Sequence, residues 1–193
     1  MTRLILVGLC AGWCSACSGL PSLASSQFEG DDEGWLLTGN GEVTEPSLER
    51  SGGNPGGNIC GVDKADGDLW YFVAPQKFLG NASSAYGKRL VFDLRQGNSF
   101  NQLRGRDVVL NGAGLALVVN FRATPGRDWT PYSFRIDETG GWLVDDTSGR
   151  GPPATAEEIK TALSNLTAIR IRGEFVDGPS DTACLDNVYW GTP

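Results

Sequence analysis

Short hydrophobic runs of strand length, separated by turn residues, fill most of this sequence and restrict the folds open to it. In one of them Leu90, Phe92 and Leu94 alternate with Asp93 and Arg95, which places apolar side chains on one face of a strand and charged side chains on the other. The gaps between runs are short, fairly even and rich in turn residues, without the helical crossovers that parallel sheets need. The pattern predicts an all-β fold, an antiparallel β-sandwich.

One helix is indicated in the last quarter of the chain. Thr155 and Glu158 have the spacing of a capping box, and Ile159, Leu163 and Leu166 then fall on one side of a helical wheel. We therefore expect one short helix packed on the surface of the sandwich.

The segment from Gly52 to Asp63 is rich in glycine, contains Pro55 and leads into a strand-like run with Cys60 in it. It is typical of a loop joined directly to a sheet. No lysine follows the glycines at the spacing of a phosphate-binding loop, so we expect them to serve backbone geometry.

Charge and residue content argue against several functions. The formal net charge is −7 at pH 7, which would repel phosphate backbones and anionic membrane surfaces, so no nucleic-acid partner is expected. Histidine is absent, which removes Ser-His-Asp and Cys-His catalysis. Neighbouring carboxylates such as Asp137 and Glu138 would point to opposite faces of a strand or lie solvated in a turn. We therefore predict no catalytic residue and no enzymatic activity.

The first residues have the pattern of an export signal. Arg3 precedes an apolar stretch too short to span a bilayer, and Ser15 and Ala16 precede Cys17, which looks like a bacterial lipobox. We expect residues 1–16 to be a signal peptide, Cys17 to be lipidated, residues 17–27 to be a flexible tether and residues 28–191 to be the folded domain. The chain would then be lipid-anchored in a bacterial cell envelope; the alternative is ordinary secretion.

Cysteine content agrees with export. Two of the five cysteines lie in the expected leader, and lipidation of Cys17 leaves Cys60 and Cys184 as a pair. In an exported protein these two are expected to form a disulfide that closes a very long loop, stabilising the fold by about 4 to 5 kcal/mol in chain-entropy models. The alternative is two separate buried thiols.

A resemblance to a known family rests on blocks that occur in order along the chain. They are Gly53–Asp63, Trp70–Gly80, Ser84–Gly87, Asp107–Gly112, Trp129–Ser133, Asp137–Trp142, Leu166–Phe175 and Leu185–Val188. In these blocks the chain resembles the laminin B domain, also named laminin IV type A. The resemblance implies a jelly-roll β-sandwich akin to galactose-binding-like and carbohydrate-binding modules, with one short helix. It also implies a non-enzymatic recognition or adhesion module at the cell envelope or outside the cell.

The resemblance further implies a structural Ca²⁺ that joins the first strand to the last. The matching positions are Glu29 and Asp186, with Asn54 or backbone carbonyls of the glycine-rich loop as further candidates. Such oxygens are the hard ligands that Ca²⁺ accepts in irregular geometry. The alternative is that Asp186 and Asn187 hydrogen-bond a buried turn while the acidic run from Glu29 to Glu33 is solvated.

Partners are expected to be a protein or a glycan at the cell surface. Four aromatic residues near turns are candidates for stacking on sugars: Tyr86, Trp129, Tyr132 and Trp142. A carbohydrate-binding module is therefore the main alternative function, and a glycoside-active enzyme is the distant one.

Overall fold

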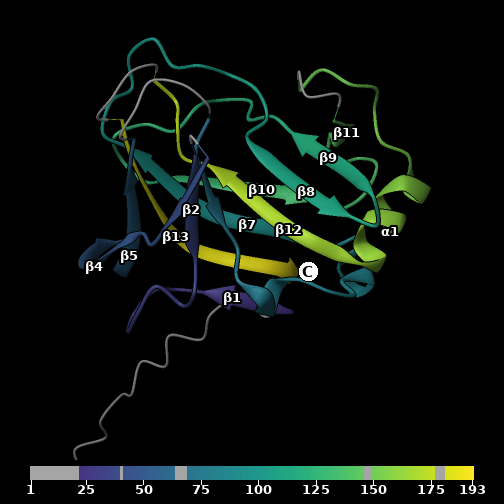
Figure 1. Cartoon of the computed structure of the whole chain (residues 1–193), viewed down its shortest axis with the longest axis horizontal. Coiled ribbons are helices and arrows are strands. Elements are labelled where there is room, and N and C mark those ends of the chain that lie inside the picture. The colour runs from purple at the N-terminus through teal and green to yellow at the C-terminus, as the bar shows by residue number, and fades with distance from the viewer. Residues whose placement is uncertain (1–21, 40, 64–68, 146–148, 177–180) are drawn as a thin grey trace, which may run out of the picture.

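The computed structural model describes residues 22–39, 41–63, 69–145, 149–176 and 181–193, which form two antiparallel β-sheets packed face to face (Figure 1). We name them sheet A and sheet B. In spatial order, sheet A contains β10 (Thr130–Arg135), β7 (Arg89–Gln96), β13 (Thr182–Thr192), β5 (Gly56–Val62) and β4 (Ser47–Gly53), and β1 (Ala24–Ser26) also pairs with β13. Sheet B contains β11 (Leu143–Val144), β9 (Leu115–Val119), β8 (Val108–Gly112), β12 (Leu166–Arg172), β6 (Tyr71–Val73), β2 (Leu36–Gly39) and β3 (Glu42–Thr44). The antiparallel sandwich expected from the sequence is confirmed.

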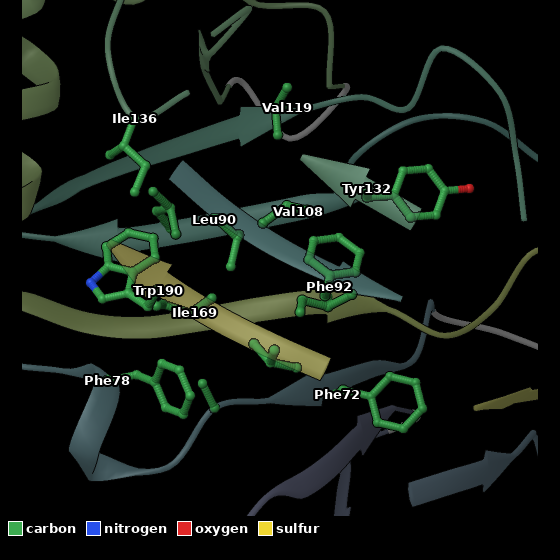
Figure 2. Close-up of a cluster of buried hydrophobic side chains, with 14 of the residues drawn as sticks. Phe72, Phe78, Leu90, Phe92, Val108, Val119, Tyr132, Ile136, Ile169 and Trp190 are labelled. Atoms are coloured by element: carbon green, nitrogen blue, oxygen red, sulfur yellow. The ribbon is translucent and has the colours of Figure 1, made fainter. Parts of the chain in front are cut away.

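The core lies between the two sheets. Leu90, Phe92 and Leu94 of β7 are fully buried, as their alternation predicts, and they meet side chains of sheet B such as Val108 and Ile169 (Figure 2). Large aromatic rings fill much of the same layer, which gives a small domain a large buried apolar surface.

The single α-helix in the described part of the chain, α1 (Ala156–Ser164), begins where its capping box predicts. The Glu158 backbone N–H donates to Thr155 Oγ1 at 3.2 Å, and the Thr155 N–H donates to Glu158 Oε2 at 2.8 Å. Ile159 and Leu163 are buried, and the helix lies against β8 and β9. Two 3-10 turns, Gln76–Phe78 and Ser83–Ala85, complete the helical elements described.

The folded domain begins earlier than the sequence predicts. Residues 17–27 are expected to be a tether, but Ala24 pairs with Trp190 and Ser26 with Val188 as strand β1. Ser26 Oγ also accepts a hydrogen bond from the indole N–H of Trp35 at 2.9 Å. Strands pair through backbone groups whatever side chains they carry. A segment of serine and alanine can therefore join a sheet without the alternation of large apolar and polar side chains that marks a strand in the sequence. The expected signal peptide and Cys17 lie outside the described residues.

Candidate functional site

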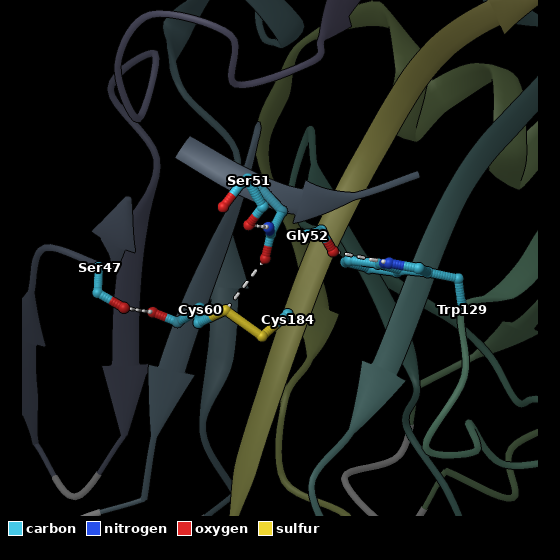
Figure 3. Close-up of a disulfide and its surroundings, with 7 residues drawn as sticks. Ser47, Ser51, Gly52, Cys60, Trp129 and Cys184 are labelled. Atoms are coloured by element: carbon cyan, nitrogen blue, oxygen red, sulfur yellow. Dashed lines mark hydrogen bonds between the residues drawn. A yellow bond between two sulfur atoms is a disulfide. The ribbon is translucent and has the colours of Figure 1, made fainter. Parts of the chain in front are cut away.

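The cysteines on sheet A form the disulfide that the sequence predicts, which excludes two separate thiols. Cys60 of β5 and Cys184 of β13 are direct partners across the two strands, with an S–S distance of 2.07 Å and a sequence separation of 124 (Figure 3). Their pairing extends across the sheet, because Ser47 of β4 lies opposite Cys60 and Arg95 of β7 lies opposite Cys184. The disulfide therefore lies on the outer face of sheet A, away from the core.

The turn that joins β4 to β5 folds over this outer face, and we name its residues Gly52–Asn54 the strap. The indole N–H of Trp129 donates to the Gly52 carbonyl at 3.0 Å, which fastens the strap near the start of β10 (Figure 3). The Asn54 backbone N–H donates to Asp186 Oδ2 of β13 at 2.6 Å. The strap thus reaches from the edge of the sheet over β13 and β7.

Oxygen atoms converge beneath the strap, where the sequence predicts a Ca²⁺ site. A Cβ added to Gly53 would lie 2.8 Å from both Asp186 Oδ2 and the Gly56 carbonyl oxygen and would collide with the Gly57 carbonyl oxygen. A Cβ on Gly56 would collide with Glu29 Oε1. Gly53 has no room for a side chain because a backbone oxygen fills the space, whereas at Gly56 the space is taken by the flexible end of Glu29. We name the group of Glu29, Gly53, Gly56, Gly57 and Asp186 the oxygen cradle.

Buried charge accumulates at the cradle. Asp186 is fully buried, and the loss of solvent, with smaller effects from the Asp93 and Glu29 charges, raises its pKa to about 6 against the hydrogen bonds from Asn54 and Asn187. Its protein partners are backbone N–H groups of Asn54 and Asn187, and within the described residues no group of three or more His, Cys, Asp or Glu side chains could hold a metal. Backbone carbonyls would have to contribute to any cation site here, and Ca²⁺ accepts such ligands.

One further residue at this place was not among the predicted site residues. Asp93 Oδ2 accepts hydrogen bonds from the side-chain amides of Asn54 at 3.1 Å and Asn187 at 2.9 Å. The alternation in β7 already placed Asp93 on the polar face, so its position was foreseeable. Asn187, which the sequence alternative names beside Asp186, lies at a register shift in β13 with a positive φ of 52°.

The structure corrects two of the four expected stacking residues. Trp142 is 2% exposed and its indole N–H donates to the Arg135 carbonyl at 2.7 Å. Tyr132 is 8% exposed, packs against Phe92 and Phe121, and donates its hydroxyl proton to the Ala123 carbonyl. Both rings face inward because their apolar bodies fill the core while their polar atoms find backbone partners, so neither can stack on a sugar.

The other two stacking candidates are only partly buried. Tyr86 donates a hydrogen bond to Glu138 at 2.6 Å, and Lys160 Nζ lies 4.4 Å from the centroid of its ring. Trp129 carries the Arg95 guanidinium over its ring at 5.0 Å. Each ring therefore has a cation over one face, and stacking on a sugar stays a prediction for both.

A groove opens at the edge where the chain passes from sheet B to sheet A. It has a volume of about 500 Å³ and is lined by Leu37, Thr38, Gly39, Glu42, Thr44, Glu45, Ser47, Cys60, Gly61, Val62, Asp63 and Trp70. We name it the edge groove. Its floor is formed in part by the buried Trp70, whose ring lies where a Cβ on Gly61 would be. Three of the lining residues are acidic and none is basic.

These features define a class of protein: an extracellular-type, disulfide-linked jelly-roll β-sandwich. The chain belongs to the Laminin B (Domain IV) family, whose sequence model matches residues 71–192. It is 32% identical over 174 residues to human laminin subunit gamma-1, an alignment that covers 86% of this chain and 10% of that protein. The chain spans about a tenth of the length of such relatives.

The solved structure of a laminin domain agrees with the fold. The L4b domain of human laminin alpha-2 has a TM-score of 0.62 at 13% sequence identity, with 86% of this chain and 96% of that domain covered. A family 11 carbohydrate-binding module of a Clostridium thermocellum cellulase has a TM-score of 0.49 at 14% identity, with 90% of this chain and 91% of that module covered. At these identities the likeness to the laminin domain shows the fold alone.

Proposed function

We propose that this protein is a non-catalytic recognition module that acts outside the cell and binds an extended segment of a partner protein in the edge groove. Membership of the laminin family supports the general role, since the fold is shared with a domain of laminin subunits. The observation that carries the binding mode is an incompletely paired strand at the groove. The pairing of β4 with β5 ends at Ser47 and Cys60, so Gly61 and Val62 pair with β13 on one side alone.

An incompletely paired strand can accept a further strand. Its free backbone N–H and C=O groups hydrogen-bond an extended peptide, and neighbouring pockets select the side chains of that peptide. Glu42, Glu45 and Asp63 make the groove acidic, and the Val62 side chain is 49% exposed beside it. A segment that alternates basic and β-branched residues fits this charge and surface best.

The test is to pan a library of displayed peptides against the purified protein. We expect enrichment of Lys- or Arg-containing peptides with Val, Ile or Thr between the basic residues. Binding should fall about tenfold or more in Glu45→Lys, because a reversed charge repels a basic ligand. The matched control is Glu157→Lys on α1, which is also exposed and lies outside the groove. If the selected peptides bind both variants as tightly as they bind the wild type, the edge groove is not the binding surface.

Glycan binding is the second candidate function, and the half-exposed Trp129 beside Arg95 favours it. Aromatic side chains at protein surfaces supply flat apolar area for a sugar ring. Glycan-array binding that is lost in Trp129→Ala would support this function over a protein partner.

We also propose that the oxygen cradle holds a structural Ca²⁺. The residues fit such an ion: Glu29 and Asp186 supply carboxylate oxygens, and the carbonyls of Gly56 and Gly57 lie beside them. A divalent cation would offset the burial of Asp186 and its proximity to Asp93. It would bind the first residues of the domain, the strap and the last strand together.

Export and anchoring complete the proposal. The relatives are laminin subunits and the disulfide suits an oxidising compartment, which supports export of the chain. Lipidation at Cys17 is proposed from the sequence alone. Intact mass of the purified membrane fraction tests it: a diacylated chain that begins at Cys17 is expected, and an unmodified chain that begins further on would contradict it.

A further inference from the structure

A recess on the outer face of sheet A gathers positive charge. It has a volume of about 410 Å³ and is lined by Arg95, Gln96, Gly97, Arg127, Thr182 and Cys184. These residues come from the ends of β7 and β13 and from the segment before β10. The recess therefore lies beside the disulfide, and its lining shares no residue with that of the edge groove.

Arg95 is held in place without using its full hydrogen-bonding capacity. Its guanidinium carbon lies 5.0 Å from the centroid of the Trp129 ring, and Trp129 is itself fastened to the strap through Gly52. A Cβ on Gly52 would be 3.8 Å from Arg95 Nη2, so the strap flanks the guanidinium. The Arg95 Nε–H is buried and has no hydrogen-bond partner. Leaving a buried N–H unpaired costs free energy, and an anionic acceptor would recover it.

The charge of the recess runs against the composition of the chain. The protein has 23 acidic and 16 basic residues, yet none of the six lining residues is acidic and two are arginines. In the described part of the chain neither Arg95 nor Arg127 forms an ion pair with a carboxylate. Asp93, which shares the outer face of β7, is occupied by the amides of Asn54 and Asn187. The two guanidiniums are therefore available to an anionic ligand.

The surroundings favour a sugar acid as that ligand. A guanidinium binds a carboxylate through two parallel N–H donors, which a single Lys ammonium cannot match. The edge of β7 that faces away from β13 is already in use here, because the Gln96 N–H donates to the Gly126 carbonyl at 2.8 Å, so little strand edge is left for a peptide to add to. The Trp129 ring holds the Arg95 guanidinium in position at 5.0 Å, and Thr182 adds a hydroxyl to the lining of the recess. We propose that this recess binds the carboxylate of a uronic-acid residue in a surface or extracellular polysaccharide.

The test compares two probes of equal length by isothermal titration calorimetry on the whole purified protein. Tetragalacturonic acid should bind, and its fully methyl-esterified form should bind at least about tenfold more weakly, because only the acid presents carboxylates to the arginines. Arg95→Gln and Arg127→Gln should each weaken binding of the acid about tenfold to a hundredfold. Arg122→Gln, another exposed arginine outside the recess, is the matched control and should change the affinity less than twofold.

Three results would overturn the proposal. One is equal affinity for the acid and its ester, and another is unchanged affinity in Arg127→Gln, whose exposed side chain can be replaced without loss of the fold. The third is tighter binding of tetraglutamate than of the sugar acid with the same dependence on Arg95, which would assign the recess to an acidic peptide. Glu45→Lys should bind the sugar acid as tightly as the wild type does. This variant therefore distinguishes a wrong proposal for the edge groove from a wrong proposal for the recess.

Discussion

The backbone N–H of Asn54 donates a hydrogen bond of 2.6 Å to Asp186, 132 residues further along the chain. This bond joins the turn of the β4–β5 hairpin to the last strand of the domain. The disulfide makes the same connection two residues earlier in β13, between Cys60 and Cys184. The glycine-rich segment is thus fixed to the end of the chain by a covalent bond and by buried polar contacts.

Removal of the disulfide should destabilise the domain. Because Cys60 and Cys184 lie 124 residues apart, the bond restricts the unfolded chain strongly, and Cys60→Ser with Cys184→Ser should lower the free energy of unfolding by about 2 to 5 kcal/mol. Urea titration of the double variant and the oxidised wild type measures this difference. Adding reductant to the double variant should change nothing further, and equal stability of the two proteins would show that the bond contributes little.

Calcium should raise the thermal stability of the domain. A ligand that binds only the native state stabilises it by about 2.7 kcal/mol at one hundred times its dissociation constant. Scanning calorimetry of the wild type should therefore give a higher melting temperature in 1 mM Ca²⁺ than in EDTA. An unmoved melting temperature in both conditions would contradict the Ca²⁺ site.

The variant that isolates the cradle is Gly56→Ala. Its Cβ would collide with the flexible end of Glu29, which can move aside at the cost of one carboxylate ligand. Gly56 has a φ of +94°, so Ala also brings backbone strain, and Gly80→Ala at φ +88° with nothing within 4 Å is the matched control for that strain. Only Gly56→Ala should lose the calcium-dependent rise in melting temperature.

The contribution of Asp186 and Glu174 to stability without calcium should fall as the pH rises from about 4 to 7. Burial raises the pKa of Asp186 to about 6 and that of Glu174 to about 7, so both carboxyls bind protons more tightly in the folded chain than in the unfolded chain. Below the unfolded pKa values both states are protonated, whereas between the unfolded and the folded values the unfolded chain releases protons that the folded chain still holds, which favours unfolding progressively. Unfolding in urea at a series of pH values in EDTA measures the slope. Asp186→Asn and Glu174→Gln should each flatten it, whereas Glu157→Gln on the surface should not.

The parts of the fold that could be predicted are those with local signals. The alternation of Leu90, Phe92 and Leu94 located β7, and the capping box at Thr155 located α1, because both patterns follow from the geometry of one element. Strand β1 could not be found, since Ser and Ala pair through the backbone and leave no apolar alternation. Edge strand β3 is only three residues long and exposes Val43, so burial leaves no mark on its sequence.

The candidate site was predicted in part for the same reason. Cys60 and Cys184 could be paired by counting cysteines, which requires no knowledge of where residues lie in space. A position near a turn does not reveal which face a ring takes, and so Trp142 proved to be buried. The acidic edge groove and the arginine-lined recess are each formed by strands that meet only after folding. Spacing along the chain therefore cannot show them.

The buried ion pair between Arg172 and Asp107 should be the most sensitive polar contact in the core. Their side chains are 1% and 2% exposed, with 2.7 Å between Nη2 and Oδ1, and Asp107 Oδ2 also accepts the Phe121 N–H. Asp107→Asn should cost about 3 to 5 kcal/mol, because it leaves the guanidinium charged and uncompensated away from water. Adding Arg172→Met to that variant should restore part of the loss, which a double-mutant cycle in urea would record as a coupling energy.

The surface pair of Arg135 and Asp137 is the control for that cycle. Its atoms are 2.8 Å apart, but the Arg135 side chain is 45% exposed, so solvent screens the charges. Arg135→Gln should cost less than about 1 kcal/mol. The prediction is contradicted if the two pairs lose equal free energy of unfolding, or if the losses at Arg172 and Asp107 are additive. Either result would mean that the buried arginine reaches water when its partner is removed. The expected contrast follows from burial alone, since the two pairs have nearly the same separation.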